Sequence, residues 1–204
     1  MDNIADRFKI LDSQRDSKLE RARFCSSLTV PSILPPENWT EQDQLPQPYS
    51  SVSARGVTAM ASRMLSALLP LNDMPFFKFD LASGVDPEPE INDYLENLSF
   101  QVYNKLSGNN MRESIYQALQ HLIVVGDVMM IMGDDMSFRL IRLDRFVCRR
   151  DVYGNLEEVI YIEYETLPEV TEDNMTLHAG QSIGEYDRSG YRAVYTCAWK
   201  EDGV

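Results

Sequence analysis

Apolar residues recur at helical spacing in four stretches of the first part of the chain. In residues 2–24 they form one stripe, and the opposite face mixes acidic and basic side chains, which predicts a surface helix. A wide apolar face predicts a second helix over 50–69. The same spacing predicts a third helix over 86–108 and a fourth over 111–125.

The later part of the chain changes to short apolar runs and alternating apolar and polar residues, which are typical of strands. Phe77 to Leu81 already alternates in this way and predicts an isolated short strand. The turn from Asp151 to Asn155 should join two later strands into a hairpin. Further strands are predicted over 128–132, 138–143, 146–149, 156–164 and 191–201. Helices followed by an antiparallel meander predict an α+β fold.

The distribution of proline and acidic residues divides the chain further. Prolines between 29 and 48 exclude a continuous helix and predict an extended arm, which could lie on a neighbouring subunit. Asp202-Gly203 is a strong hairpin-turn signal after the last strand, and only Val204 follows it, so we expect a longer protein. The predicted parts are an N-terminal helix (1–28), a Pro-rich arm (29–48), a helical and antiparallel-sheet core (49–165), and an acidic insertion with an incomplete hairpin (166–204).

Composition limits the class of protein. The 204 residues are 44% apolar, which is enough for a hydrophobic core. No apolar stretch is long enough to cross a membrane, and the N-terminus lacks the apolar region of a signal peptide. We therefore expect a protein that stays in the cytoplasm or in a particle assembled there. The three cysteines are far apart in the sequence, which favours reduced thiols over a disulfide framework.

Charge is unevenly placed along a chain whose net charge is −13. Residues 139–150 are rich in arginine, whereas 151–187 contain acids and neither lysine nor arginine. Adjacent blocks of opposite charge suit contacts between subunits. Solvated strand faces and loops are the simpler interpretation. The candidate contact residues are Arg139, Arg142, Arg145, Arg149, Arg150, Glu157, Glu158, Glu163 and Glu165.

No motif in the sequence favours catalysis. Gly133-Asp134-Asp135 resembles the hairpin on which viral RNA polymerases hold catalytic magnesium, but Gly-Asp-Asp is also an ordinary turn and the chain is too short for a polymerase. The sequence contains no phosphate-binding loop, dinucleotide fingerprint or nucleophile elbow. The two histidines stand alone, without zinc-ligand spacing. We predict no enzymatic activity, no metal and no cofactor.

Several segments resemble the head-to-tail connector, or portal, proteins of short-tailed bacteriophages. Ala54-Arg55-Gly56 opens a Leu-rich helix that Pro70 closes, and Thr29-Val-Pro-Ser32 precedes it. Leu122-Ile-Val-Val-Gly126 and Arg150-Asp-Val-Tyr-Gly-Asn155 follow in the family's order. The resemblance covers roughly residues 20–165, and 166–204 match only loosely.

The resemblance implies a structural role in a virion. Portals of this family are dodecameric rings at one capsid vertex and have no catalytic residues of their own. Terminase pumps double-stranded DNA in through the ring, a tail adaptor docks outside, and the ring contacts the major capsid and scaffolding proteins. This chain would hold mainly the N-terminal wing region, assembled in the host cytoplasm. The alternative is a free-standing acidic interaction module: a chaperone, an adaptor or a DNA mimic.

Overall fold

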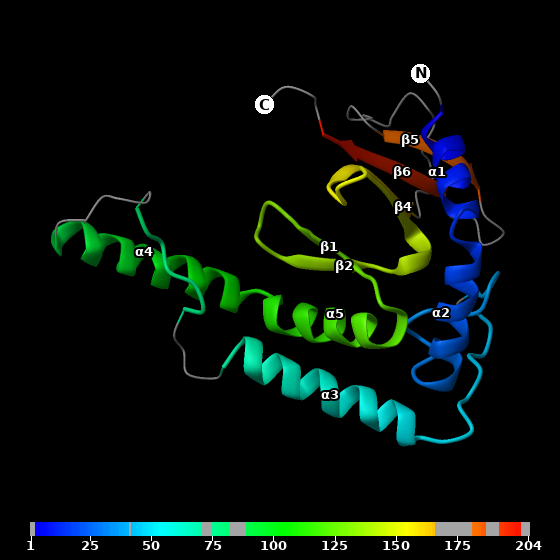
Figure 1. Ribbon diagram of the computed structural model, residues 1–204, viewed down its shortest axis with the longest axis horizontal. Helices are drawn as coiled ribbons and strands as arrows, with labels where there is room; N and C mark the ends of the chain where they lie inside the picture. The colour runs from blue at the N-terminus through cyan, green and yellow to red at the C-terminus, as the bar shows by residue number, and fades with distance from the viewer. Residues whose placement is uncertain are drawn as a thin grey trace. The chain divides into compact units, whose positions relative to one another are not determined.

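Two segments that are far apart in the sequence form one unit of the fold. In the computed structural model, Met1–Tyr49 and Ile141–Val204 form one compact unit, the sheet unit, and Ser50–Leu140 form a second, the helical unit (Figure 1). The structure describes residues 3–40, 42–70, 75–81, 89–165, 181–186 and 192–200. The predicted turn at Asp202-Gly203 therefore lies outside the described residues.

A four-stranded antiparallel sheet forms the centre of the sheet unit, in the order β3-β4-β6-β5. Its strands are β3 (Phe146–Arg150), β4 (Leu156–Glu165), β5 (Gln181–Tyr186) and β6 (Arg192–Trp199), and a short 3₁₀ helix, η1 (Leu143–Arg145), precedes β3. Helix α1 (Ile4–Ser13) packs on this sheet. Phe8 of α1 is buried in a core whose other members are Val147, Ile160, Ile162, Ala193 and Cys197.

The predicted N-terminal helix is divided into two. Helix α1 ends at Ser13, and α2 (Asp16–Leu28) starts after Arg15, whose guanidinium pairs with Asp12 at 2.8 Å. Every residue between Leu11 and Leu19 is polar. The apolar stripe is therefore interrupted, and no buried side chain holds the two segments in one continuous helix.

Helices α3 (Val52–Leu68) and α5 (Met111–Val125) pack on each other in the helical unit. Both agree with the predicted ranges. Val57 and Ala61 of α3 are buried, as is Leu119 of α5. Nη1 of Arg112 donates to the carbonyl oxygen of Leu69 at 2.8 Å, which satisfies one of the unpaired carbonyls at the end of α3.

The predicted strand over 77–81 is wrong, because this segment packs on helix α4 (Pro89–Gly108) and forms no strand. Residues 75–81 are irregular and contact α4 instead of a sheet: Phe76 lies edge-on to Tyr103, with 6.2 Å between ring centroids. The backbone N–H of Phe79 donates to Oγ of Ser99 at 3.2 Å. Aromatic residues at alternate positions can line one side of an extended segment without any strand pairing. The predicted opening of the third helix at Asp86-Pro87 lies outside the described residues.

The hairpin predicted across the turn from Asp151 to Asn155 is confirmed, whereas the strand predicted over 138–143 ends at Ile141 because Leu143 belongs to η1. Strands β1 (Met129–Met132) and β2 (Phe138–Ile141) form a two-stranded sheet, and β3 pairs with β4 across the predicted turn. Asn110, at the start of α5, holds β2 with its side-chain amide: it donates to the carbonyl oxygen of Phe138 at 2.6 Å and accepts from the N–H of Phe138 at 2.8 Å. The α+β fold is therefore confirmed.

Strand β5 was not predicted from the sequence. Strand β6 pairs with β4 on one side and with β5 on the other, so it lies inside the sheet. The sequence gives little sign of β5, because Gln181–Tyr186 has few apolar residues and lies in an acidic stretch. An edge strand needs only one pairing partner and can have a weak apolar pattern.

Candidate functional site

The arginine block and the acidic block meet within one chain, at the end of the β3–β4 hairpin. Nε of Arg149 lies 3.1 Å from a carboxylate oxygen of Glu157 and 3.9 Å from one of Glu158. The pairing register shifts between Arg149 and Arg150, so Glu157 is an extra residue on β4, as in a β-bulge. This bulge allows two neighbouring carboxylates to contact a single guanidinium.

Glu158 is the buried member of this cluster, because only 3% of its surface is exposed. Nη2 of Arg7 on α1 lies 2.5 Å from its Oε1, and the Cys197 thiol donates to the same oxygen at 3.3 Å. Burial, with a further contribution from this hydrogen bond, raises the pKa of Cys197 to about 11. The thiol therefore stays protonated at neutral pH, and the carboxylate is held between α1 and the sheet.

Sequence reasoning named Glu158 but missed Arg7 and Cys197, which are distant in the chain. A signal was present: Glu158 is in phase with Ile160 and Ile162, the inward-facing positions of β4. A charged residue at such a position requires a buried partner. The sequence could have predicted the need for a cation but could not have identified Arg7.

The other candidate residues have separate surroundings. Arg142 and Asp144 form an ion pair at 2.9 Å, and the guanidinium of Arg145 lies over the ring of Tyr164, 5.0 Å from its centroid. Arg150 donates to the carbonyl oxygen of Gly154 at 3.0 Å.

Three positions complete the predicted set. Arg139 lies on β2, in the helical unit, whereas the other arginines of the block belong to the sheet unit. Glu163 is half-buried on β4. The side chain of Glu165 lies outside the described residues. A contact between subunits through these residues stays a prediction, and it depends on the exposed members Arg139, Arg149, Arg150 and Glu157.

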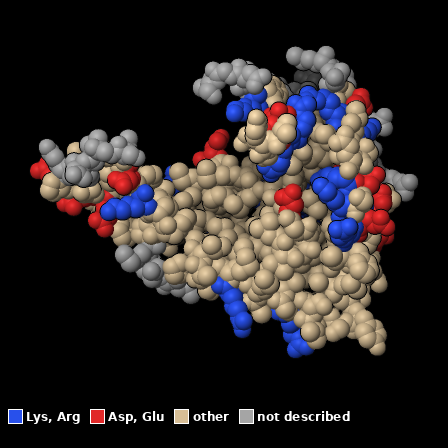
Figure 2. All heavy atoms as spheres, viewed as in Figure 1, with Lys and Arg blue, Asp and Glu red and all other residues tan. Residues whose placement is uncertain are grey.

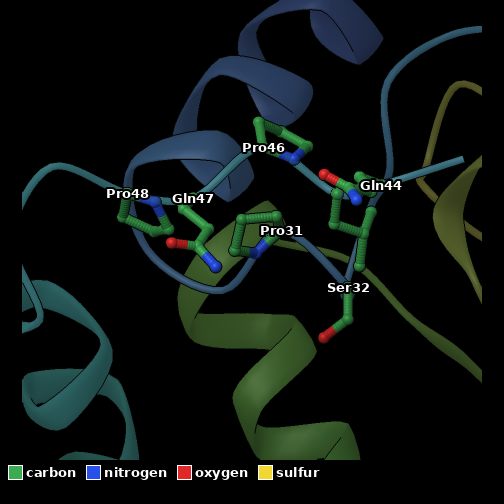
Figure 3. A pocket seen from close by; sticks show the side chains of 7 residues that line it. Pro31, Ser32, Gln44, Pro46, Gln47 and Pro48 are labelled. Carbon is green, nitrogen blue, oxygen red and sulfur yellow. The ribbon is translucent and has the colours of Figure 1, made fainter.

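The Pro-rich segment forms a depression of about 690 Å³ on the sheet unit (Figure 3). Pro31 and Ser32 of the turn after α2 line it, together with the later stretch from Gln44 to Pro48. Ser26 of α2 ties this segment to the helix, because its Oγ donates to the carbonyl oxygen of Val30 at 2.9 Å and accepts from the N–H of Leu34 at 3.1 Å. The start of the arm is therefore attached to its own chain.

Gly133-Asp134-Asp135 forms the turn between β1 and β2. Oδ1 of Asp135 accepts from Oγ of Ser137 at 2.7 Å and from its backbone N–H at 3.0 Å, and these bonds lower the pKa of Asp135. The left-handed residue of the turn is Met136, with φ of 62°. Among the described residues, no group of three or more His, Cys, Asp or Glu side chains is arranged to hold a metal ion. The motif thus has a conformational role in this turn.

The helices were compared in length and apolar character with what a membrane span requires. Within the described ranges, none combines the length and the apolar character that crossing a bilayer requires.

Comparison with known proteins identifies the family. Residues 1–173 match the family described as bacteriophage head to tail connecting protein. This match covers most of the chain, so the protein belongs to that family, and the resemblance inferred from its motifs is confirmed.

Two relatives carry a more specific name. The portal protein of Enterobacteria phage T3 is 27% identical over 198 residues, a match that covers 91% of this chain and 37% of the relative. The portal protein of Escherichia phage T7 is 23% identical over 202 residues and covers 92% of this chain and 38% of the relative. The chain therefore spans less than two fifths of the length of these two relatives.

Proposed function

We propose that this chain is the N-terminal wing part of a phage portal subunit, a ring-forming structural protein at one capsid vertex. The observation that carries the proposal is the match of more than nine tenths of the chain to portal proteins of two phages. The ring would be a dodecamer and would serve as the conduit for double-stranded DNA during packaging and ejection. Its place is the virion, after assembly in the host cytoplasm.

The proposed role is structural, without catalysis. The family description names a connection between head and tail, which fits a ring that contacts capsid and scaffolding proteins on one side and a tail adaptor on the other. Terminase would dock on the same ring while it pumps DNA. A free-standing acidic interaction module has no comparable support.

The net charge of −13 is compatible with a DNA conduit. Non-specific binding to duplex DNA depends on lysine and arginine that neutralise phosphates. A strongly acidic subunit repels phosphates, and DNA can then move past it without being held.

Native mass spectrometry and negative-stain imaging of the gene product test this function. We expect a closed ring with a central hole and a copy number near that of a dodecamer. A stable monomer or dimer over the micromolar concentration range would contradict the portal role and favour the interaction module.

A further inference from the structure

Helix α4 is poorly covered within its own chain. Ser99 is the only buried residue in the range Pro89–Gly108. Tyr94 is 67% exposed and Ile91 is 41% exposed, although both are large apolar side chains near the start of the helix. A helix of this length gains most of its stability from packing an apolar face, so we expect α4 to gain a partner in the assembled protein.

The outer face of α4 is acidic. Glu90, Asp93 and Tyr94 project from the side of the helix opposite Ser99, and all three are exposed. Figure 2 shows acidic side chains clustered at the end of the helical unit where α4 begins. A partner should therefore be basic and should offer apolar surface for Tyr94.

The outer face of α3 has these properties. Helix α3 contains Arg55 and Arg63 and no acidic residue, and both arginines are exposed. In Figure 2 basic side chains project from an otherwise uncharged surface where α3 lies. Met60 lies beside Arg63 on the same face and is 54% exposed, and Val52 is 66% exposed.

We propose that the outer face of α3 in one copy binds the outer face of α4 in the next copy. A closed ring requires two different, complementary faces on every subunit, and these two faces belong to the same unit of the fold. Arg55 and Arg63 pair with Glu90 and Asp93, while the Tyr94 ring packs on the thioether of Met60. The inference rests on the proposed ring function and assigns its contact surface.

Charge reversal with complementation tests the contact on the intact gene product. Variant A carries Arg55→Glu and Arg63→Glu, and variant B carries Glu90→Lys and Asp93→Lys. In either variant alone, like charges face each other across every contact, so we expect loss of the ring and sedimentation as monomers. In an equimolar mixture both kinds of contact between A and B are complementary, and we expect rings of alternating copies.

A matched control reverses two exposed lysines of the sheet unit, Lys9→Glu and Lys18→Glu, which changes the net charge as much as variant A does. This control should assemble normally. Circular dichroism should show unchanged helix content for A and B, since the altered side chains are exposed.

The outcomes separate the contact from the function. If the wild type forms rings and variants A and B also form them, or if both fail and the mixture does not restore rings, the proposed contact is wrong and the portal function stands. If the wild type forms no ring under any condition, the contact and the function are both wrong.

Discussion

In the sheet unit, α1 covers the sheet and shares one core with it, whereas in the helical unit a whole helix contributes a single buried residue. Phe8 of α1 is 5% exposed and Ile160 beneath it is fully buried, but Tyr94 of α4 is 67% exposed. Charged residues follow the same division. The buried Glu158 has partners in its own chain, while the outer faces of α3 and α4 carry charges of opposite sign.

This difference separates intrinsic stability from assembly. A core that is closed within one chain stabilises the subunit before it meets another copy. Exposed apolar side chains stabilise nothing until a partner removes them from water. The sheet unit should therefore determine the free energy of unfolding, and the helical unit should determine whether copies associate.

The largest expected change in the free energy of unfolding comes from Phe8→Ala in the sheet unit. Removal of a buried phenylalanine should lower the free energy of unfolding by about 3–5 kcal/mol in chemical denaturation, because α1 loses its anchor on the sheet. The control Tyr94→Ala should change the unfolding free energy of dissociated subunits by less than about 0.5 kcal/mol. Equal losses of unfolding free energy for Phe8→Ala and Tyr94→Ala would show that the sheet unit does not determine stability more than the helical unit does.

The next largest effect on the free energy of unfolding should come from a comparison of two single variants, Glu158→Ala and Glu157→Ala. Glu158→Ala removes the buried carboxylate that pairs with Arg7 and accepts from Cys197, and it should lower the free energy of unfolding by about 2–4 kcal/mol, somewhat less than for a fully buried pair because Arg7 is partly exposed. Glu157→Ala removes an exposed ion pair and should cost at most about 1 kcal/mol. Urea denaturation of both variants measures the difference, and a cost below that of Glu157→Ala would show that Glu158 does not hold α1.

The smallest expected effect is the pH dependence of the β3–β4 turn. Hydrogen bonds lower the pKa of Asp151: the largest contribution is from the Asn155 side chain, and backbone N–H groups of the turn add to it. Because the folded pKa lies below the unfolded one, the stabilisation is complete above about pH 4 and is lost as the pH falls through the lowered value.

NMR titration of the Asp151 carboxyl measures this directly. The midpoint should be lower than that of an aspartate in an unfolded peptide, and the protection of the Tyr153 and Asn155 amides, relative to their exchange rates in an unfolded peptide at the same pH, should fall at pH values below it. Asp151→Asn should remove the pH dependence of that protection. A midpoint at the ordinary value would mean that the turn does not depend on the carboxylate.

Elements with strong local signals could be predicted from the sequence. Helix α5 starts and ends where predicted, and its end is defined by Gly126, which takes the left-handed conformation. The β3–β4 hairpin was also predicted, since Gly154 has φ of 86° and few residues other than glycine adopt that value easily.

Features that depend on distant contacts could not be predicted. The alternation in Phe77 to Leu81 is real, but the aromatic rings pack near α4 instead of in a sheet. Strand β5 has little apolar pattern of its own and is defined by its pairing with β6. In the candidate site the local arginine and glutamate pairs were visible in the sequence, whereas the Arg7–Glu158 pair joins residues that are far apart in the chain.

The side-chain amide of Asn110 covers the open edge of strand β2, where a strand from another copy of the protein could otherwise pair. The N–H and C=O of Phe138 point away from β1, and the Asn110 side chain occupies both, as a neighbouring strand would. Open strand edges are templates on which other chains can start aggregation. Oγ of Ser114 also donates to the carbonyl oxygen of Phe138 at 3.1 Å, so a foreign strand would have to displace three existing hydrogen bonds before it could begin to pair at Phe138. The Asn110 side chain thus protects the hairpin against pairing with a strand of another copy at high protein concentration.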